Sequence, residues 1–140
     1  TPAGAGETIE VLGILEVIPR TGNNPNFVYS LENKRECLTR LDYVTPPAAP
    51  GPQIRRIEDA ALSVFRALEC RDVARIDFRL SETGTPFFLE ANPLPGLNPT
   101  IGDLPILARQ LGFSYTDLIG KILSAALGRL RLSEAAAGVS

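Results

Sequence analysis

Two short segments separated by turn residues constrain the fold of this chain more than any other feature. Residues 73–80 (VARIDFRL) and 87–91 (FFLEA) have the residue types of strands, and the stretch between them (SETGTP) has those of a turn. This pattern predicts a β-hairpin. We assign Thr83 and Gly84 to the centre of a tight two-residue turn, which fixes the register of the two strands.

This register sorts the side chains of the hairpin into a polar and an apolar face. Because side chains alternate along a strand, one face carries Arg75 opposite Asn92 and Asp77 opposite Glu90. The opposite face is apolar and is expected to pack on helices. Its pairs are Ile76 with Ala91, Phe78 with Leu89 and Leu80 with Phe87.

The two facing carboxylates, Asp77 and Glu90, need a positive charge between them. Like charges at the cross-strand distance, about 4.5–5.5 Å between Cβ atoms, destabilise a hairpin when nothing neutralises them. Arg75 is one source of that charge and a metal ion is another. With the Asn92 carboxamide, the two carboxylates form an all-oxygen set that suits Mg²⁺. A solvated face with an arginine–carboxylate network is the alternative, and the spacing alone leaves both open.

The composition narrows the chemistry that this chain can perform. The sequence contains no histidine, which excludes Ser-His-Asp and Cys-His catalysis and histidine-ligated zinc. A net charge of −2 with dispersed basic residues argues against a nucleic-acid partner. Charged residues interrupt every apolar run before the length of roughly 18–20 residues that a membrane span needs. Cys37 and Cys70 are expected to be free thiols in a reducing cytoplasm, although a disulfide stays open.

The remaining patterns predict an α+β domain, with an antiparallel sheet and helices packed on one face. Ser114 and Asp117 are expected to form a capping box. Residues 1–7 are expected to be a flexible lead-in, 8–132 the domain and 133–140 a flexible tail. The other elements expected, in order, are strands at 8–18, 27–29 and 42–45, a helix at 53–69, and helices at 103–111 and after the capping box.

The loop that follows the second hairpin strand is unusually stiff. Pro93 and Pro95 fix two φ angles and remove two donors, and Gly96 allows a close approach of the backbone to a ligand. An ordinary connection between a strand and a helix is the alternative. Such a connection does not require Asn92 before its first proline, nor a second carboxylate across the sheet.

Several segments, taken together, resemble one known family. RIDF (75–78) and FLEANPLPG (88–96) look like the C-terminal signature of ATP-grasp enzymes, and most of all that of D-alanine–D-alanine ligases. LGFSYTDLI (111–119) fits the terminal helices of that family. VYSLENK (28–34) is similar to a segment that carries an active-site lysine in a mobile loop. The resemblance covers roughly residues 8–130, and the hairpin motif is its more specific part.

This resemblance implies a ligase that uses ATP to turn a carboxylate into an acyl phosphate, which an amine then attacks. It implies two Mg²⁺ ions, with Mn²⁺ as a substitute. Asp77 and Glu90 would bind one ion, and Glu90 and Asn92 the second. The resemblance also implies an amino-acid or dipeptide substrate, a role in peptidoglycan and cell-wall synthesis, and a cytoplasmic location. It is compatible with a homodimer.

The same resemblance implies roles for four further residues. Arg75 would stabilise negative charge on the transferred phosphate, and the Gly96 N–H would hold the developing oxyanion. Lys34 would reach the terminal phosphate of the nucleotide when its loop closes. Phe88, expected on the same face as Glu90, would line the nucleotide pocket.

Two departures from the family limit what the resemblance implies. D-alanine–D-alanine ligases usually carry a serine after the loop glycine, whereas this chain has TIGD (100–103), which leaves the acceptor amino acid open. The chain also begins with Thr1 rather than methionine and has no room for an N-terminal domain. We therefore expect a piece of a longer protein that is not a competent ligase by itself. The alternatives are an ATP-grasp ligase for another amino-acid or peptide acceptor, and a non-catalytic regulatory or interaction module that retains the fold.

Overall fold

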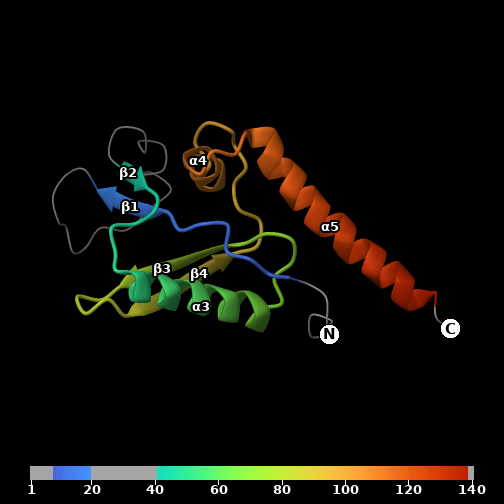
Figure 1. Ribbon diagram of the computed structural model, residues 1–140, viewed down its shortest axis with the longest axis horizontal. Coiled ribbons are helices and arrows are strands. Elements are labelled where there is room, and N and C mark those ends of the chain that lie inside the picture. The colour runs from blue at the N-terminus through green and yellow to red at the C-terminus, as the bar shows by residue number, and fades with distance from the viewer. Residues whose placement is uncertain (1–7, 20–40, 139–140) are drawn as a thin grey trace.

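A computed structural model of the 140-residue chain describes residues 8–19 and 41–138 (Figure 1). Over these residues the fold is α+β, as predicted, and its strands are antiparallel. The predicted single sheet is replaced by two separate two-stranded sheets. The predicted strand at 27–29, together with Lys34 and Cys37, lies outside the described residues. The elements are β1 (Glu16–Pro19), β2 (Leu41–Val44), α3 (Gly51–Ala67), β3 (Arg75–Leu80), β4 (Pro86–Asn92), α4 (Asp103–Gln110) and α5 (Tyr115–Ala137).

The strand predicted at 8–18 is much shorter in the structure. Its paired part, β1, matches the four residues of β2, from Glu16 opposite Val44 to the last pair at Pro19. Before β1 the chain packs on α4: a Cβ added to Gly13 would lie 3.2 Å from a methyl carbon of Leu107. The Ile14 carbonyl accepts a hydrogen bond from a side chain, the Thr45 hydroxyl, at 2.6 Å. A continuous apolar run fits such a packed, extended segment as well as it fits a strand, so the pattern could not separate them.

The turn of the hairpin has three residues rather than the predicted two. Ser81 and Thr85 face each other, and the Ser81 N–H donates to the Thr85 carbonyl at 3.0 Å. The three residues between them end at Gly84, whose φ of +80° places it in the left-handed region. A three-residue loop that ends in this conformation is a common hairpin connection. It moves the register next to the turn by one residue.

A β-bulge then restores the predicted register towards the open end of the hairpin. Near the turn Phe78 faces Phe88, so the predicted pairs Phe78 with Leu89 and Leu80 with Phe87 are wrong. The register shifts between Asp77 and Phe78, and Leu89 is the extra residue in β4. Beyond the bulge the three predicted pairs are confirmed, namely Asp77 with Glu90, Ile76 with Ala91 and Arg75 with Asn92.

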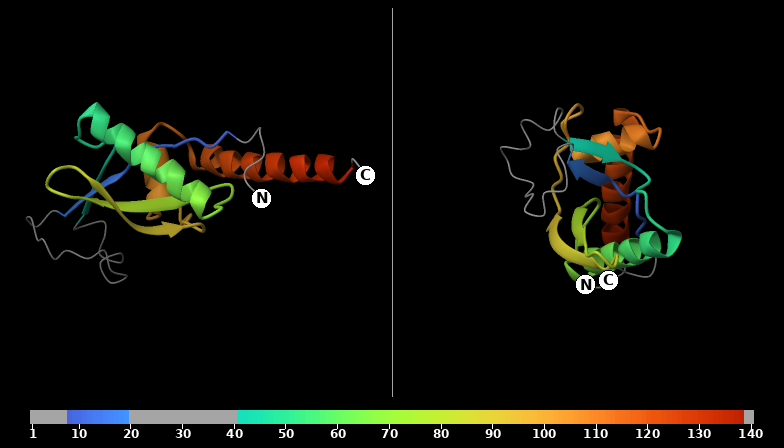
Figure 2. Two further views of the ribbon diagram at one scale, coloured as in Figure 1. Left: turned by 90° about the horizontal axis from the view of Figure 1, so that it is seen from below. Right: turned by 90° about the vertical axis from the view of Figure 1, so that its left-hand side faces the viewer.

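Helix α3 lies along one face of this hairpin (Figure 2). Its first turn contains Pro52, as is usual for helix starts, and the helix buries Ile57 towards the sheet. The Gln53 side chain contacts the hairpin turn at Gly84, where an added Cβ would lie 2.8 Å from its Nε2. The predicted packing of helices on one sheet face therefore holds for α3. It does not cover the whole predicted apolar set, since Phe87 and Leu89 are each 59% exposed.

The core of the described residues centres on α4. This helix contacts α5, and its Gln110 side chain donates a hydrogen bond of 2.8 Å to the Tyr43 carbonyl of β2. Pro105 of α4 and Leu118 of α5 are the largest fully buried side chains. The buried apolar residues are Leu41, Ile57, Ile106, Leu107, Ala108 and Leu118.

Helix α5 extends away from the rest of the structure (Figures 1 and 2). The predicted capping box opens it: the Asp117 N–H donates to the Ser114 hydroxyl at 3.0 Å, and the Ser114 N–H donates to the Asp117 carboxylate at 2.9 Å. The helix runs to Ala137, so the predicted tail at 133–140 begins inside it. Within the described ranges, no helix combines the length and the apolar character that a bilayer crossing requires.

Candidate active site

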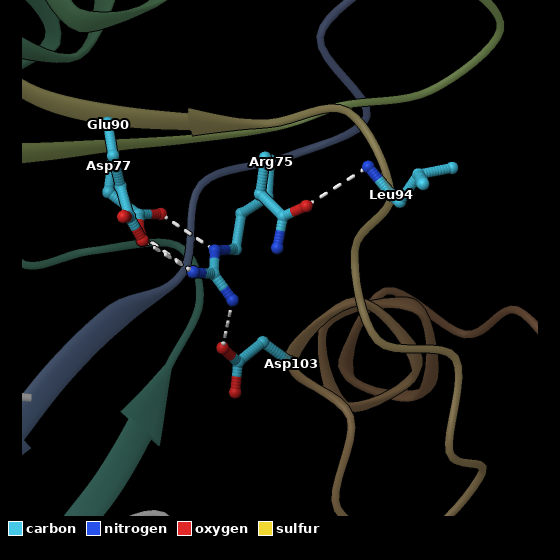
Figure 3. A network of polar contacts seen from close by, with 6 residues as sticks. Arg75, Asp77, Glu90, Leu94 and Asp103 are labelled. Carbon is cyan, nitrogen blue, oxygen red and sulfur yellow. Dashed lines mark hydrogen bonds and ion pairs between the residues drawn. The ribbon is translucent and has the colours of Figure 1, made fainter. Parts of the chain in front are cut away.

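The guanidinium of Arg75 is the centre of the polar face of the hairpin (Figure 3). It binds Asp77 through two nitrogens, with Nε 2.8 Å from Oδ1 and Nη2 2.9 Å from Oδ2. The same Nη2 lies 3.2 Å from Oε1 of Glu90. Because one nitrogen contacts both carboxylates, the two acidic side chains converge as their cross-strand pairing predicts. Arg75 supplies the positive charge that the facing carboxylates need.

A third carboxylate reaches Arg75 from another element. Asp103, the first residue of α4, accepts a hydrogen bond of 2.9 Å from Nη1 of Arg75. Figure 3 shows the guanidinium between Asp77 and Glu90 on one side and Asp103 on the other. The sequence pattern does not mark Asp103 as a site residue. The signal that the sequence offers for Asp103 is an acidic residue in the first turn of the helix that follows the proline-rich loop.

The three carboxylates differ in their access to solvent. The Asp103 side chain is 11% exposed and that of Asp77 is 30% exposed, whereas that of Glu90 is 64% exposed. The Arg75 side chain is 21% exposed. Contacts within the site are therefore screened least at Asp103 and most at Glu90. Glu90 is the carboxylate that a ligand from solvent meets first.

Asn92 ends the hairpin and orients the loop after it. Its side-chain oxygen accepts a hydrogen bond of 3.0 Å from the Leu94 N–H, which turns the chain at Pro93. An amide oxygen has two lone pairs, so this bond leaves one for a further partner. The loop is held at Pro95, which is buried. A Cβ added to Gly96 would meet no atom within 4 Å, so the space beside Gly96 is open.

The oxygen ligands of the hairpin fit an open Mg²⁺ site, in which water and a bound ligand complete the coordination. In the described part of the chain no three Asp, Glu, His or Cys side chains gather as metal ligands. The candidate set is two carboxylates, Asp77 and Glu90, and the amide of Asn92. Protein sites for Mg²⁺ commonly use one or two carboxylates and complete the coordination with water and substrate phosphates. The hairpin therefore suits Mg²⁺ that arrives with a phosphate-bearing ligand, and does not suit a closed structural metal site.

The bulge changes which aromatic side chain lies beside the carboxylates. Phe88 packs edge-to-face on Phe78, with ring centroids 6.3 Å apart, and so lies on the face opposite Asp77. The prediction that Phe88 shares the face of Glu90 is wrong. Phe87 faces Arg79 instead, and Arg79 lies on the same face as Asp77. An exposed aromatic ring is thus present on the polar face, one residue before the predicted one.

The structure brings together four of the seven predicted site residues. Arg75, Asp77, Glu90 and Asn92 form the open end of the hairpin. Gly96 follows in the adjoining loop. Phe88 lies on the opposite face, and Lys34 falls outside the described residues.

A shallow surface hollow elsewhere has residues with structural roles. It lies between Glu10 and the start of α5, away from the hairpin. There the Nζ of Lys121 lies 4.9 Å from the centre of the Phe113 ring, a cation–π contact. Hydrogen bonds from Ser114 hold the pKa of Asp117 below its usual value, as the capping box requires. These contacts stabilise the start of α5 and do not form a site.

Comparisons with known proteins agree with the hairpin motif. Residues 4–124 match the family model described as the D-ala D-ala ligase C-terminus. A D-alanine–D-alanine ligase of Pelotomaculum thermopropionicum is 35% identical over 116 residues, which are 83% of this chain and 34% of that protein. A second, from Anaeromyxobacter dehalogenans, is 34% identical over 84% of this chain and 36% of its own length. This chain therefore spans about a third of the curated relatives it matches.

Solved structures show the same likeness in three dimensions. The crystal structure of D-alanine–D-alanine ligase from Bacillus anthracis matches with a TM-score of 0.59 and 30% identity, over 67% of this chain and 30% of that one. The same ligase complexed with ATP matches with a TM-score of 0.57 and 28% identity, over 66% and 34%.

The fold and the hairpin are those of the C-terminal part of an ATP-grasp ligase. Within that class, this chain belongs to the D-alanine–D-alanine ligase family, in which it matches the C-terminal domain.

Proposed function

We propose that this chain is the magnesium-binding C-terminal part of an ATP-dependent carboxylate–amine ligase of the D-alanine–D-alanine type, which acts in peptidoglycan synthesis in the cytoplasm. The observation that carries the proposal is the convergence of Asp77 and Glu90 on Nη2 of Arg75, at 2.9 and 3.2 Å. Family membership supports the reaction class, and the Bacillus anthracis relative has been solved with ATP.

The reaction proposed has two steps that the hairpin residues suit. A substrate carboxylate attacks the terminal phosphorus of ATP, and ADP leaves as an acyl phosphate forms. An amine then attacks the acyl carbon, and phosphate leaves as the amide forms. Bound Mg²⁺ would neutralise the phosphate oxygens during the transfer. Neither step requires histidine, in keeping with the composition.

Each hairpin residue has a proposed part in these steps. Asp77 and Glu90 would hold one Mg²⁺, and Glu90 with the Asn92 oxygen the second. Arg75 would then turn its charge from the carboxylates to the transferring phosphate and the tetrahedral oxyanion. The Gly96 N–H would donate to that oxyanion, and the open space beside Gly96 is consistent with this role.

The nucleotide-binding roles stay predictions. Lys34 would contact the terminal phosphate. The resemblance assigns Phe88 to the nucleotide pocket. Both rings are exposed, but Phe87 lies on the face of Asp77 and Phe88 on the opposite face, so Phe87 is the better placed of the two. A flat ring beside the carboxylates suits a nucleobase whose phosphates reach the metal ligands.

The acceptor amine has a second candidate. In the segment TIGD (100–103), the Asn98 side chain binds the backbone of Thr100 and Ile101, and Asp103 binds Arg75. None of these residues presents the serine usual in the family, which favours another amino acid or a peptide as acceptor. A panel of acceptor amines, assayed with the full-length ligase, separates this candidate from D-alanine.

The metal site is tested by calorimetric titration of this chain with Mg²⁺ and ADP. We expect heat that requires Mg²⁺ and that Glu90→Gln removes, because the amide brings no charge to the ion. Glu82→Gln in the hairpin turn is the matched control and should bind as the wild type does. Equal binding by wild type and Glu90→Gln would reject the hairpin as the metal site. Mg²⁺-independent nucleotide binding would favour the non-catalytic module that retains the fold.

A further inference from the structure

Asp103 contacts Arg75 beside Asp77 and Glu90, but it is not a ligand of the proposed metal site. Asp77 and Glu90 come from the hairpin, whereas Asp103 belongs to α4 and is separated from Arg75 by 28 residues. It is also the least exposed of the three, at 11%. A contact of this kind between two elements sets the direction of the guanidinium as well as its charge balance.

The backbone holds Asp103 firmly in place. It follows Gly102, which is buried and where an added Cβ would lie 2.7 Å from the carbonyl oxygens of both Gly96 and Asn98. The Gly102 N–H donates to the Asn98 carbonyl at 2.9 Å, which closes the loop in front of α4. A carboxylate in the first turn of a helix is also favoured by the helix dipole. Asp103 is thus an anion whose position is fixed before any ligand arrives.

The planar guanidinium of Arg75 divides its donors between two directions. Nε and Nη2 point to the hairpin carboxylates, and Nη1 points to Asp103. A divalent cation at Asp77 and Glu90 would compete with Nε and Nη2 for the same oxygens, and would repel the guanidinium. The bond from Nη1 would survive this competition, because Asp103 lies on the other side (Figure 3).

We propose that Asp103 is a positioning residue for Arg75 that raises the affinity of the hairpin for a divalent cation. It holds the guanidinium towards α4 and so lowers the cost of releasing Asp77 and Glu90 to the cation. Arg75 then stays beside the site, charged and oriented, when the cation is bound. This inference rests on the proposed function, since it requires that the hairpin binds a metal.

The test is a calorimetric titration of the 140-residue chain with the Mn²⁺ complex of ADP, because the hairpin suits a cation that arrives with a phosphate-bearing ligand. Asp103→Asn should weaken Mn²⁺ binding about fivefold, the scale of a partly buried ion pair. Arg75→Gln should strengthen binding, because it removes the competing charge. In the Arg75→Gln background, Asp103→Asn should have no further effect. Circular dichroism verifies that each variant is folded, and Asp103→Ser serves as the second variant if Asp103→Asn does not fold.

The matched control is Asp72→Asn. It removes the charge of another partly buried aspartate whose arginine partner, Arg129, belongs to α5 and not to the proposed metal site. This variant should bind Mn²⁺ as the wild type does, although it is less stable. Equal Mn²⁺ affinity in Asp103→Asn and wild type would overturn the inference. So would the same loss of affinity with and without Arg75, since Asp103 would then act by its charge alone. No Mn²⁺ binding by the wild-type chain would instead reject the metal site itself, and the inference with it.

Discussion

At the scale of single residues, the proposed chemistry depends on which negatively charged groups the guanidinium of Arg75 contacts. Two carboxylates of the hairpin and one of α4 share its guanidinium. The sequence pattern allows both an arginine–carboxylate network and a metal site on the polar face of the hairpin. The network is present, and the metal site stays a proposal. The two are compatible, because the arginine holds the facing carboxylates together until a stronger cation takes its place.

A second arginine–aspartate pair joins α5 to the segment before β3. Arg129 of α5 binds Asp72 through two nitrogens, at 3.0 and 2.8 Å. The hydrogen bond from Arg129 is the main reason why the pKa of Asp72 lies below its usual value. A lowered pKa in the folded state means that the pair stabilises the fold fully above the unfolded pKa, about 3.9. That stabilisation is lost as the pH falls through the folded pKa.

Asp72→Asn should therefore lower the free energy of unfolding at pH 7 by about 1 kcal/mol and reduce its dependence on pH below about 4. Asparagine tolerates the left-handed backbone at this position, where φ is 62°, so the change removes charge without adding strain. Urea midpoints measured at pH 7 and at pH 3 check the prediction. Asp59→Asn on the surface of α3 is the control. A loss of equal size at both pH values would assign the effect to something other than this ion pair.

At the scale of elements, the hairpin contains two register shifts that cancel each other. The three-residue turn displaces the pairing by one residue, and the bulge at Leu89 displaces it back. The pairs at the site were thus predictable, whereas those near the turn were not. The run Phe87-Phe88-Leu89 has no alternation of polar and apolar residues, so nothing in it fixes the register. Site residues that do alternate, such as Asp77 between Ile76 and Phe78, were placed correctly.

The start of α5 offers a prediction of its own. Ser114→Ala removes the hydroxyl that accepts the Asp117 N–H, and should lower the stability of the chain by about 1 kcal/mol. Ser124→Ala, an exposed serine inside the same helix, should be neutral or slightly stabilising, since alanine is the better helix former. Thermal unfolding followed by circular dichroism compares the two. Equal melting temperatures for both variants would rule out a stabilising capping box.

At the scale of the whole molecule, this chain matches the C-terminal domain of a ligase family. It spans 34% and 36% of two ligases that it matches, and its family was readable from the hairpin motif. The contact between Arg75 and Asp103 could not be predicted from the sequence. The two residues meet only in the tertiary fold, and no local pattern links them. The same limit applies before β1, where Gly13 packs on Leu107 of α4 rather than on a strand.

We predict that this chain alone does not release phosphate from ATP in the presence of amino acids. The N-terminal part of the ligase would supply the first substrate site and much of the nucleotide clamp. Phosphate release measured on the chain by itself, and again after addition of the N-terminal part of a related ligase, checks this expectation. Amino-acid-dependent turnover by the chain alone would contradict it, whereas turnover after mixing would support it.

The bulge in β4 has a last consequence for molecules that lie along the hairpin. It reverses the parity of the strand, so that the face with Asp77 and Glu90 at its open end also carries the exposed Phe87, opposite Arg79, near its turn. An elongated ligand along this face would meet the carboxylates at one end and an aromatic ring at the other, and a single inserted residue is what puts that ring there.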